Sequence, residues 1–255
     1  FSLSPDPRFF FLSAQHKTAL AKITYTAEQR QGLSVVYGDI GVGKTTIARR
    51  IYQIYNDDPT YETAYLPMPI FPSEFQFLKA VCSEFGLPPR RSKYAQIEHF
   101  NAYLVDIWEQ GKNAVVIIDE AQSLVGRQFE LIRQMLNFES NAQKLIQIIL
   151  IGQNELRNKL RLKRALQSRI ATRSTIEPLD MQDTRNMISF RVMVAGRQEP
   201  LFTEDALQLI YDYSKGMPRD VCVVGLNVLP LALVDGVHTI DADLIQRAIA
   251  EIGED

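Results

Sequence analysis

Residues 38–45 have the sequence GDIGVGKT, which matches the phosphate-loop pattern G-x-x-x-x-G-K-[ST] at every fixed position. Residues 33–37 before it (LSVVY) are apolar and β-branched enough for a buried strand. Residues 45–55 after it have helical spacing and include no Gly or Pro. Because strand, glycine loop and helix are the context that makes this pattern a binding site, the sequence predicts a site for a nucleoside triphosphate.

The loop residues have distinct expected roles. The glycines let the backbone curl so that successive N–H groups point at a phosphate, and the start of the helix adds its positive dipole end. Lys44 is expected to reach the β- and γ-phosphates, and the Thr45 hydroxyl to bind Mg²⁺. The predicted cofactors are therefore ATP and Mg²⁺, and the predicted binding residues of the loop are Gly38, Gly41, Gly43, Lys44, Thr45 and Thr46.

A second motif, VVIIDE at 115–120, places two carboxylates at the end of an apolar run. A buried strand would deliver these acids to the sheet edge where the phosphates bind. Asp119 is expected to hold the Mg²⁺ shell together with Thr45, and Glu120 to take a proton from the attacking water. Gln153, at the end of the next apolar run, is expected to orient that water. Ordinary polarity at a strand end is the alternative for Gln153.

The pattern of the whole chain predicts two domains. Predicted strands alternate with helices up to about Leu179, and the chain is helical from Asp180 onward. This order predicts an α/β domain over residues 1–179, with a five-stranded parallel sheet flanked by helices, and an α-helical lid domain over 180–255. The last strand is expected at 174–179, and the lid helices at 181–194, 203–213, 219–234 and 241–252.

The first residues form a separate segment. Residues 1–13 are rich in Pro and Phe and are expected to be an ordered arm lying across the domain, followed by a helix over 14–31. His16 is a candidate contact for the nucleotide base, and an ordinary surface or capping histidine is an equally good interpretation. The other candidates for base contacts are Phe10, Leu12 and Gln15.

The charge balance limits the possible partners. The chain has 30 acidic and 28 basic residues, a formal net charge of −2, so any contact with nucleic acid must come from a local basic patch. The loop at 86–94 (GLPPRRSKY) supplies Arg90, Arg91 and Lys93 without an acid and is the predicted DNA-binding segment. Cys82 and Cys222 lie in apolar surroundings and are expected to be buried thiols in a reducing compartment.

No membrane partner is expected from the sequence. The longest apolar run, 221–234, contains Asn227 and Pro230 and is too short to span a bilayer. The sequence therefore predicts a soluble, cytoplasmic protein.

Several stretches resemble the AAA+ ATPases and, within them, the ExeA/GspA group: FSLSPDPRF at 1–9, LSxxH at 12–16, IIDEAQ at 117–122, LIGQxEL at 150–156 and GxPR at 216–219. The resemblance covers nearly the whole chain. It implies an AAA+ P-loop NTPase with a C-terminal helical lid, and an ATPase whose site is completed by a neighbouring subunit. By this resemblance Gln153 is sensor 1 and Arg219 is sensor 2. Arg169 is the arginine finger, with Arg164 as the alternative.

One residue departs from the resemblance. Pro230 lies inside the third lid helix, where a missing backbone donor should kink it. The lid geometry at that point is therefore expected to differ from the family pattern.

The resemblance also implies partners. The ExeA/GspA group includes secretion-system ATPases and the TnsC-like ATPases of transposons, which assemble on DNA and regulate a transposase. The TnsC-like members imply a homo-oligomeric ring or filament with roughly six or seven subunits per turn. They also imply binding to duplex DNA without sequence preference, with a transposase and a target-selection protein as partners.

Three functions remain open at this point. Secretion ATPases of the group usually continue into a membrane segment, whereas this chain ends shortly after the lid. The sequence therefore favours an ATP-dependent regulator of DNA transposition. The alternatives are an ExeA/GspA-type ATPase that assists secretion-system or pilus assembly, and a nucleotide-binding switch with little affinity for DNA.

Overall fold

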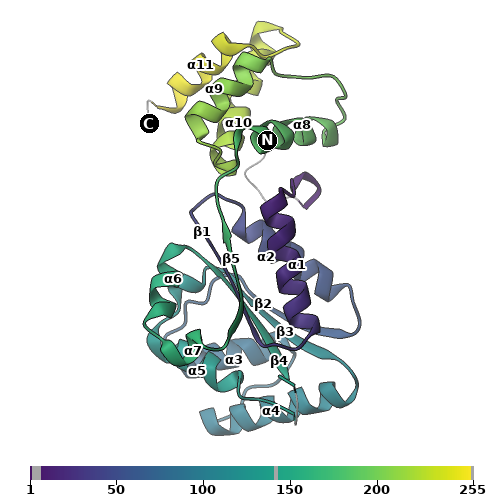
Figure 1. Ribbon diagram of the computed structural model, residues 1–255, viewed down its shortest axis with the longest axis vertical. Helices are drawn as coiled ribbons and strands as arrows, with labels where there is room; N and C mark the ends of the chain where they lie inside the picture. The colour runs from purple at the N-terminus through teal and green to yellow at the C-terminus, as the bar shows by residue number, and fades with distance from the viewer. Residues whose placement is uncertain (2–6, 141–142, 254–255) are drawn as a thin grey trace. The chain divides into compact units, whose positions relative to one another are not determined.

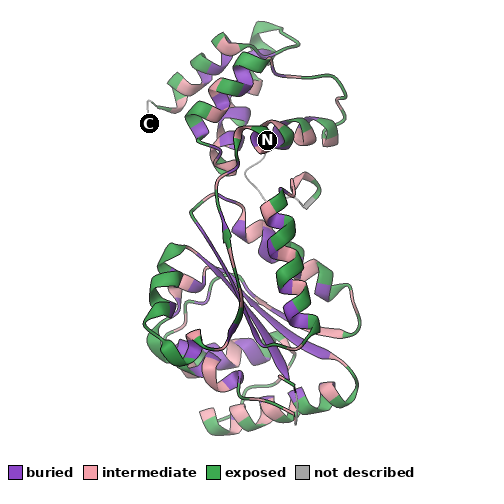
Figure 2. Ribbon diagram, viewed as in Figure 1, coloured by how far each residue is buried: buried purple, intermediate pink, exposed green. Residues whose placement is uncertain are grey.

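The buried apolar runs of the sequence form a five-stranded parallel sheet in the computed structural model, which describes residues 1, 7–140 and 143–253. The strand order is β2-β3-β4-β1-β5. The strands are β1 (Leu33–Gly38), β2 (Tyr61–Leu66), β3 (Asn113–Ile118), β4 (Ile146–Gly152) and β5 (Ile170–Ile176). Every residue of β1, β3 and β4 is buried, as expected for central strands that are covered on both faces (Figure 2). The predicted five-stranded parallel sheet is confirmed.

The chain divides into two units by contact. The first, which we call the helical unit, comprises Phe1–Gln15, Ile40–Thr46 and Glu177–Asp255. The second, the sheet unit, comprises His16–Asp39 and Ile47–Ile176. The predicted domains, 1–179 and 180–255, are each continuous in sequence, whereas both units combine separate stretches of the chain. The domain boundaries stay a prediction.

Helices cover both faces of the sheet in the sheet unit (Figure 1). They are α1 (Ala14–Glu28), α2 (Lys44–Asn56), α3 (Glu74–Glu84), α4 (Lys93–Glu109), α5 (Gly126–Met135), α6 (Asn154–Arg161) and α7 (Arg164–Gln167). Phe77 of α3, Phe100 of α4 and Phe129 of α5 pack into one core with the strands. On the α1 side, the Thr172 hydroxyl donates to Ser34 Oγ at 3.0 Å. Parallel strands end at one edge, so β1, β3 and β4 deliver the residues that follow them to the same edge.

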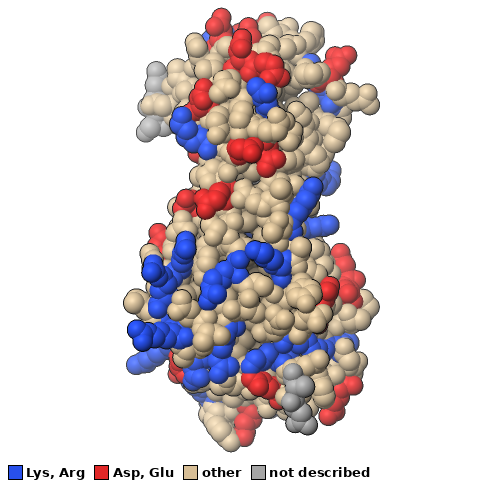
Figure 3. Space-filling model, viewed as in Figure 1, with Lys and Arg blue, Asp and Glu red and all other residues tan. Residues whose placement is uncertain are grey.

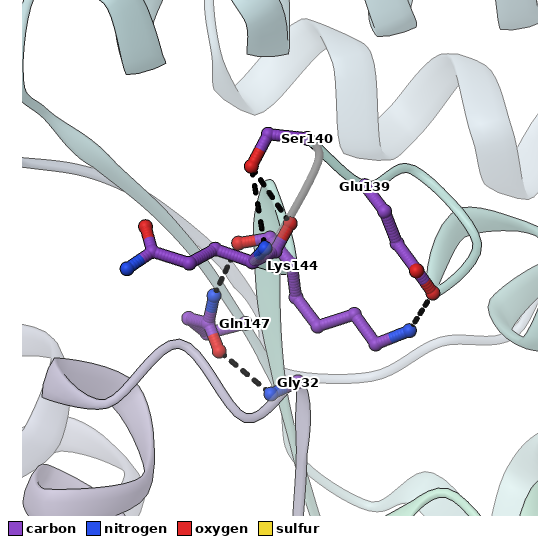
Figure 4. Close-up of polar contacts among 6 residues, drawn as sticks. Gly32, Glu139, Ser140, Lys144 and Gln147 are labelled. Atoms are coloured by element: carbon purple, nitrogen blue, oxygen red, sulfur yellow. Dashed lines mark hydrogen bonds and ion pairs between the residues drawn. The ribbon is translucent and has the colours of Figure 1, made fainter.

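A buried glutamine joins β1 and β4 where these strands begin (Figure 4). The Gly32 N–H donates to Gln147 Oε1 at 2.8 Å, and Gln147 Nε2 donates to the Lys144 carbonyl at 3.1 Å. The Lys144 ammonium forms an ion pair with Glu139. These bonds satisfy a polar side chain that is cut off from water, and they help to set the register of the two strands.

The helical unit contains η1 (Pro7–Phe9), α8 (Met181–Val194), α9 (Glu204–Ser214), α10 (Pro218–Asp235) and α11 (Ala242–Ile252). Three of these helices begin at a side-chain cap: Asp180 accepts from Asp183 N, Thr203 from Ala206 N, and Asp241 from Leu244 N. The apolar faces of α8, α9, α10 and α11 meet in a core that includes Ile188, Ile210, Val224 and Ile245. The helix α10 continues through Pro230.

The predicted arm is described only in part, because residues 2–6 lie outside the described residues. Phe1 and Phe11 pack against the core of the helical unit, and the Phe1 ring centroid lies 6.0 Å from that of Phe202.

The cysteines Cys82 and Cys222 are buried free thiols, as predicted. Burial raises the pKa of Cys82 to about 11, so this thiol stays protonated at neutral pH. No helix among residues 7–140 and 143–253 is both long enough and apolar enough to cross a membrane.

Three predicted boundaries are wrong. The helix predicted over 14–31 is α1, which ends at Glu28. The last strand is β5 at Ile170–Ile176 rather than 174–179. It is an edge strand, and because Arg173 and Thr175 occupy exposed positions, no apolar run in the sequence marks where it begins. The helix α4 begins at Lys93, with Ser92 as its cap, so the predicted basic loop ends before Lys93.

Gly216→Ala should destabilise the helical unit by about 3 kcal/mol or more. Gly216 has φ +76°, and an added Cβ would lie 1.8 Å from the Leu179 carbonyl oxygen. That backbone cannot easily move, because the Leu179 N–H donates to the Gly216 carbonyl at 2.8 Å. Urea titration followed by circular dichroism measures the loss.

Gly236→Ala is the matched control. Gly236 has φ +67°, but an added Cβ would meet nothing within 4 Å. Its loss should be limited to the left-handed backbone, about 1 kcal/mol. Equal losses for the two variants would show that the Leu179 contact is unimportant.

Candidate active site

The phosphate loop has the backbone conformation that its glycines predict. Gly41 and Gly43 have φ of +90° and +98°, in the left-handed region that glycine adopts without strain. The helix α2 begins at Lys44, whose side chain is only 5% exposed. The first turn of a helix and its positive dipole end form a type of site at which anions bind. Thr45 and Thr46 follow in the same turn and are half-buried.

The helical unit packs the start of α10 on this loop. The Arg219 N–H donates to the Gly41 carbonyl at 3.2 Å. A Cβ at position 41 would lie 3.0 Å from Arg219 Cβ and 3.2 Å from Met217 Cγ. The predicted sensor 2 residue, Arg219, is therefore anchored to the loop by its backbone, and its side chain is exposed. Sequence reasoning missed the contact of Met217.

Asp119 and Glu120 follow β3 in the sheet unit. The Asp119 N–H donates to the Leu66 carbonyl at 2.9 Å, and its Oδ1 accepts from the Glu120 N–H at 2.9 Å. Asp119 is 1% exposed. Burial, together with the charge of Asp119, raises the pKa of Tyr65 to about 12, so the Tyr65 hydroxyl stays protonated. Glu120 has φ +50°, in the left-handed region that residues other than glycine adopt only rarely.

The carboxylate of Glu120 is held by two glutamines. Gln122 Nε2 and Gln153 Nε2 both donate to Glu120 Oε2, the second at 3.4 Å. Gln122 Oε1 accepts from the Gln153 N–H at 3.1 Å. A Cβ at Gly152 would lie 2.8 Å from Gln122 Oε1 and 3.2 Å from the Gln122 backbone nitrogen, so a larger residue at the end of β4 would displace the Gln122 side chain. The structure thus brings the predicted base and the predicted sensor 1 together.

Sequence reasoning did not single out Gln122. The residue belongs to the IIDEAQ motif, which was a usable signal. The backbone at Gln122 is held by Lys159, because Lys159 Nζ donates to the Gln122 carbonyl at 2.5 Å and to the Leu124 carbonyl at 3.2 Å. One cation of the basic stretch at 157–169 is therefore used inside the sheet unit.

A further bond ties the end of β4 to the first residue after β1. Asn154 Nδ2 donates to Asp39 Oδ1 at 2.5 Å. Since Asp39 is the second residue of the phosphate loop, this bond connects the residues that follow β4 to the start of the loop. This link lies within the sheet unit.

The two candidate arginine fingers lie on either side of α7. Arg164 is its first residue and is exposed, and Arg169 lies in the turn before β5 and is half-buried. The Arg169 N–H donates to the Leu166 carbonyl at 3.0 Å. Within the described part of the chain, neither arginine side chain donates a hydrogen bond to Glu120 or to the two glutamines. A role in this site would therefore come through a second subunit.

The predicted DNA-binding residues have partners of their own. Lys93 forms an ion pair with Glu74 at 2.8 Å, so its charge is balanced by an acid that the sequence places in another helix. Arg90 Nη2 lies 3.2 Å from His99 Nδ1, while Arg91 is exposed. DNA binding by this segment stays a prediction.

Two of the candidates for contacts with the nucleotide base, Gln15 and His16, lie in the first turn of α1, whereas Phe10 and Leu12 precede this helix. His16 is buried. The Gln15 amide is engaged by the Glu177 backbone, since Gln15 Nε2 donates to its carbonyl at 2.8 Å and Gln15 Oε1 accepts from its N–H at 2.9 Å. Base contacts by either residue remain untested predictions.

The profile of the protein family described as AAA domain matches residues 27–160. The chain belongs to this family. The matched part of the AAA domain contains the phosphate loop, Asp119, Glu120, Gln122 and Gln153. The predicted AAA+ resemblance is therefore confirmed.

The General secretion pathway protein A of Aeromonas hydrophila is 35% identical over 256 residues, which cover 99% of this chain and 46% of that protein. The chain thus spans about half the length of this curated relative. The match supports the predicted ExeA/GspA resemblance and gives no support to the TnsC-like one.

Solved structures show the same fold at low identity. The Cdc6p structure from Pyrobaculum aerophilum has a TM-score of 0.73 and is 17% identical, covering 98% of this chain and 70% of that one. The Aeropyrum pernix ORC2 protein in ADPNP-ADP complexes has a TM-score of 0.70 and is also 17% identical, covering 97% and 72%. These likenesses confirm the predicted AAA+ P-loop ATPase fold.

Proposed function

We propose that this AAA domain binds and hydrolyses ATP to assist the assembly of a secretion or pilus machine, as an ATPase of the ExeA/GspA type. The observation that carries the proposal is the 35% identity to General secretion pathway protein A over 99% of this chain. The curled loop, the helix start at Lys44 and the Glu120 cluster support the ATPase part. We also propose a cytoplasmic location for this domain.

Each residue has a proposed task in the reaction. The loop N–H groups and Lys44 bind the phosphates and balance their charge. Glu120 accepts the proton of the attacking water, and Gln153 orients that water. Gln122 is a positioning residue, because its amide keeps the Glu120 carboxylate and the Gln153 backbone in one arrangement.

The donor set fits Mg²⁺. The Thr45 hydroxyl and the Asp119 carboxylate are oxygen ligands, which this ion prefers, and Mg²⁺ in phosphate sites usually takes one or two carboxylates with phosphate and water. Mg²⁺ would supply further charge neutralisation at the phosphates. No group of three or more His, Cys, Asp or Glu side chains that could hold a metal occurs in the described ranges.

We further propose that the ATPase works as a homo-oligomer, with Arg169 of one subunit completing the site of the next. Bound ATP would then hold subunits together, and its hydrolysis would release them. An arginine supplied by a second chain stabilises the charge of the transition state.

Regulation of DNA transposition, the function that the sequence alone favoured, is the weaker proposal. It depends on Arg90, Arg91 and Lys93, and Lys93 is paired with Glu74. The comparisons support the secretion alternative instead.

A chimera tests the proposed function. This chain would replace the matching part of General secretion pathway protein A in an Aeromonas hydrophila strain that lacks that protein, and secreted protein would be measured in the medium. We expect secretion to be restored, and to be lost again with Lys44→Ala. A folded chimera that hydrolyses ATP without restoring secretion would contradict the assembly role. ATP-dependent binding of duplex DNA by that chimera would favour the transposition function.

Lys44→Ala should weaken ATP binding by about a hundred-fold or more, since the phosphates lose charge-assisted hydrogen bonds from the ammonium group. Titration with a fluorescent ATP analogue measures the affinity. Lys22→Ala, which removes an exposed lysine from α1, is the control and should bind like the parent. Unchanged affinity for Lys44→Ala would contradict the assignment of the loop.

A further inference from the structure

A pocket of about 340 Å³ lies in the sheet unit beside β5, and its lining includes no residue assigned above to the nucleotide. Three arginines line it, namely Arg157, Arg161 and Arg173. Tyr37 and Thr175 add hydroxyl groups to the wall. Figure 3 shows Lys and Arg side chains gathered over α6, α7 and β5 on this face of the molecule.

The fold explains why these side chains converge. Arg157 and Arg161 are four residues apart on α6 and so share one face of the helix. Arg173 and Thr175 are two residues apart on β5 and share one face of the strand. Tyr37 of β1 is the register partner of Thr175, which places it on the same face.

The arginines lack a negative partner in this pocket. None of the lining residues is acidic, and within residues 7–140 and 143–253 no ion pair is formed by Arg157, Arg161 or Arg173. The Arg173 guanidinium donates to the Gln167 carbonyl at 3.0 Å, which fixes its direction without balancing its charge. Like charges this close repel, so an anion between them would be stabilised.

The floor of the pocket adds a neutral donor. Tyr37 is only 4% exposed, whereas the three arginines are exposed at the mouth. Burial raises the pKa of Tyr37 despite the charge of Arg173, so the hydroxyl stays protonated at neutral pH. A ligand that enters between the arginines can therefore also accept a hydrogen bond from the floor.

We propose that this pocket binds a small anion with two linked phosphoryl groups, at a site separate from the phosphate loop. A guanidinium presents a planar fork of donors that matches phosphoryl oxygens in pairs. Three such forks exceed what the two oxygens of one carboxylate can satisfy, whereas each phosphoryl group of pyrophosphate brings three terminal oxygens and a charge of about −1.5. The volume suits a small ligand, since pockets for small molecules start at about 300 Å³.

Isothermal titration calorimetry with inorganic pyrophosphate tests the proposal in the full chain carrying Lys44→Ala, which weakens the phosphate loop as a competing site. We expect the Lys44→Ala chain to bind pyrophosphate. Adding Arg157→Gln and Arg173→Gln should weaken this binding by about a hundred-fold, or about ten-fold for each guanidinium. Adding Lys22→Gln and Arg127→Gln instead makes the same change in net charge at exposed positions outside the pocket, and it should leave the affinity unchanged.

Two further measurements identify the ligand that supplies the anion and keep the test valid if a variant misfolds. Tighter binding of ADP than of pyrophosphate would show that the pocket binds the diphosphate group and also contacts the attached nucleoside. Tyr37→Phe removes a single hydroxyl and should weaken pyrophosphate binding by about three- to ten-fold even if the double arginine variant fails to fold.

The proposal is overturned if the Lys44→Ala chain does not bind pyrophosphate. It is also overturned if the folded Arg157→Gln and Arg173→Gln variant, or Tyr37→Phe in its place, binds pyrophosphate unchanged. Arginine-dependent binding of short duplex DNA without any binding of pyrophosphate would assign the pocket to nucleic acid and overturn the small-anion proposal.

Discussion

Glu120→Gln should slow ATP hydrolysis by about 10²- to 10⁴-fold while ATP affinity stays within about three-fold of the parent, the range expected when a general base is removed. The substituted amide keeps the size of the carboxylate but cannot take a proton from water. Gln122 and Gln153 donate to Glu120 Oε2 in the parent, so the surrounding cluster is already shaped for a side chain of this length. Phosphate release under saturating ATP and Mg²⁺ measures the rate, and analogue titration measures the affinity.

Glu130→Gln is the matched control, because Glu130 is an exposed glutamate of α5 that pairs with Arg133 at 2.6 Å. Its turnover should equal that of the parent. Gln122→Ala should lower kcat more than KM if Gln122 positions the base, whereas Gln122→Glu would put a second carboxylate beside Glu120 and should not rescue the rate. Normal turnover by Glu120→Gln would show that another group activates the water.

Arg169→Ala should retain ATP binding and lose hydrolysis by about a thousand-fold or more, the effect expected of an arginine supplied by a neighbouring subunit. In one chain its side chain makes no hydrogen bond to the Glu120 cluster within the described residues, and it is half-buried in the turn between α7 and β5. The expected loss therefore appears only in the assembled protein.

Mixing provides the decisive measurement. Arg169→Ala and Lys44→Ala are each expected to be inactive, yet a mixed oligomer can join an intact nucleotide site to an intact arginine. Recovered ATPase activity in the mixture would support action across subunits. Arg127→Ala, which removes an exposed arginine of α5, is the control and should keep the parent's activity. Confirmed mixed assembly without recovered activity would exclude Arg169 as the finger and leave Arg164 to be tested in the same way.

The sequence by itself determined the elements that depend on local patterns. The phosphate loop at 38–45, the buried strands β1, β3 and β4, and the acids after β3 were all predicted, because apolar runs and glycine positions report burial and backbone conformation directly. The parallel order followed from the alternation of strands and helices. Edge strand β5 was misplaced because exposed polar residues, Arg173 and Thr175, interrupt its apolar pattern.

Only the tertiary structure decided which side chains from different elements meet. Gln122 joins Glu120 to Gln153, Glu74 balances Lys93, and arginines of α6 and β5 gather around one pocket. Periodicity along a chain shows which face of an element is buried, but it does not contain the register and packing that bring separate elements within hydrogen-bonding distance. The phosphate loop and the acids after β3 could therefore be predicted from the sequence, whereas the residues that hold the Glu120 side chain in place could not.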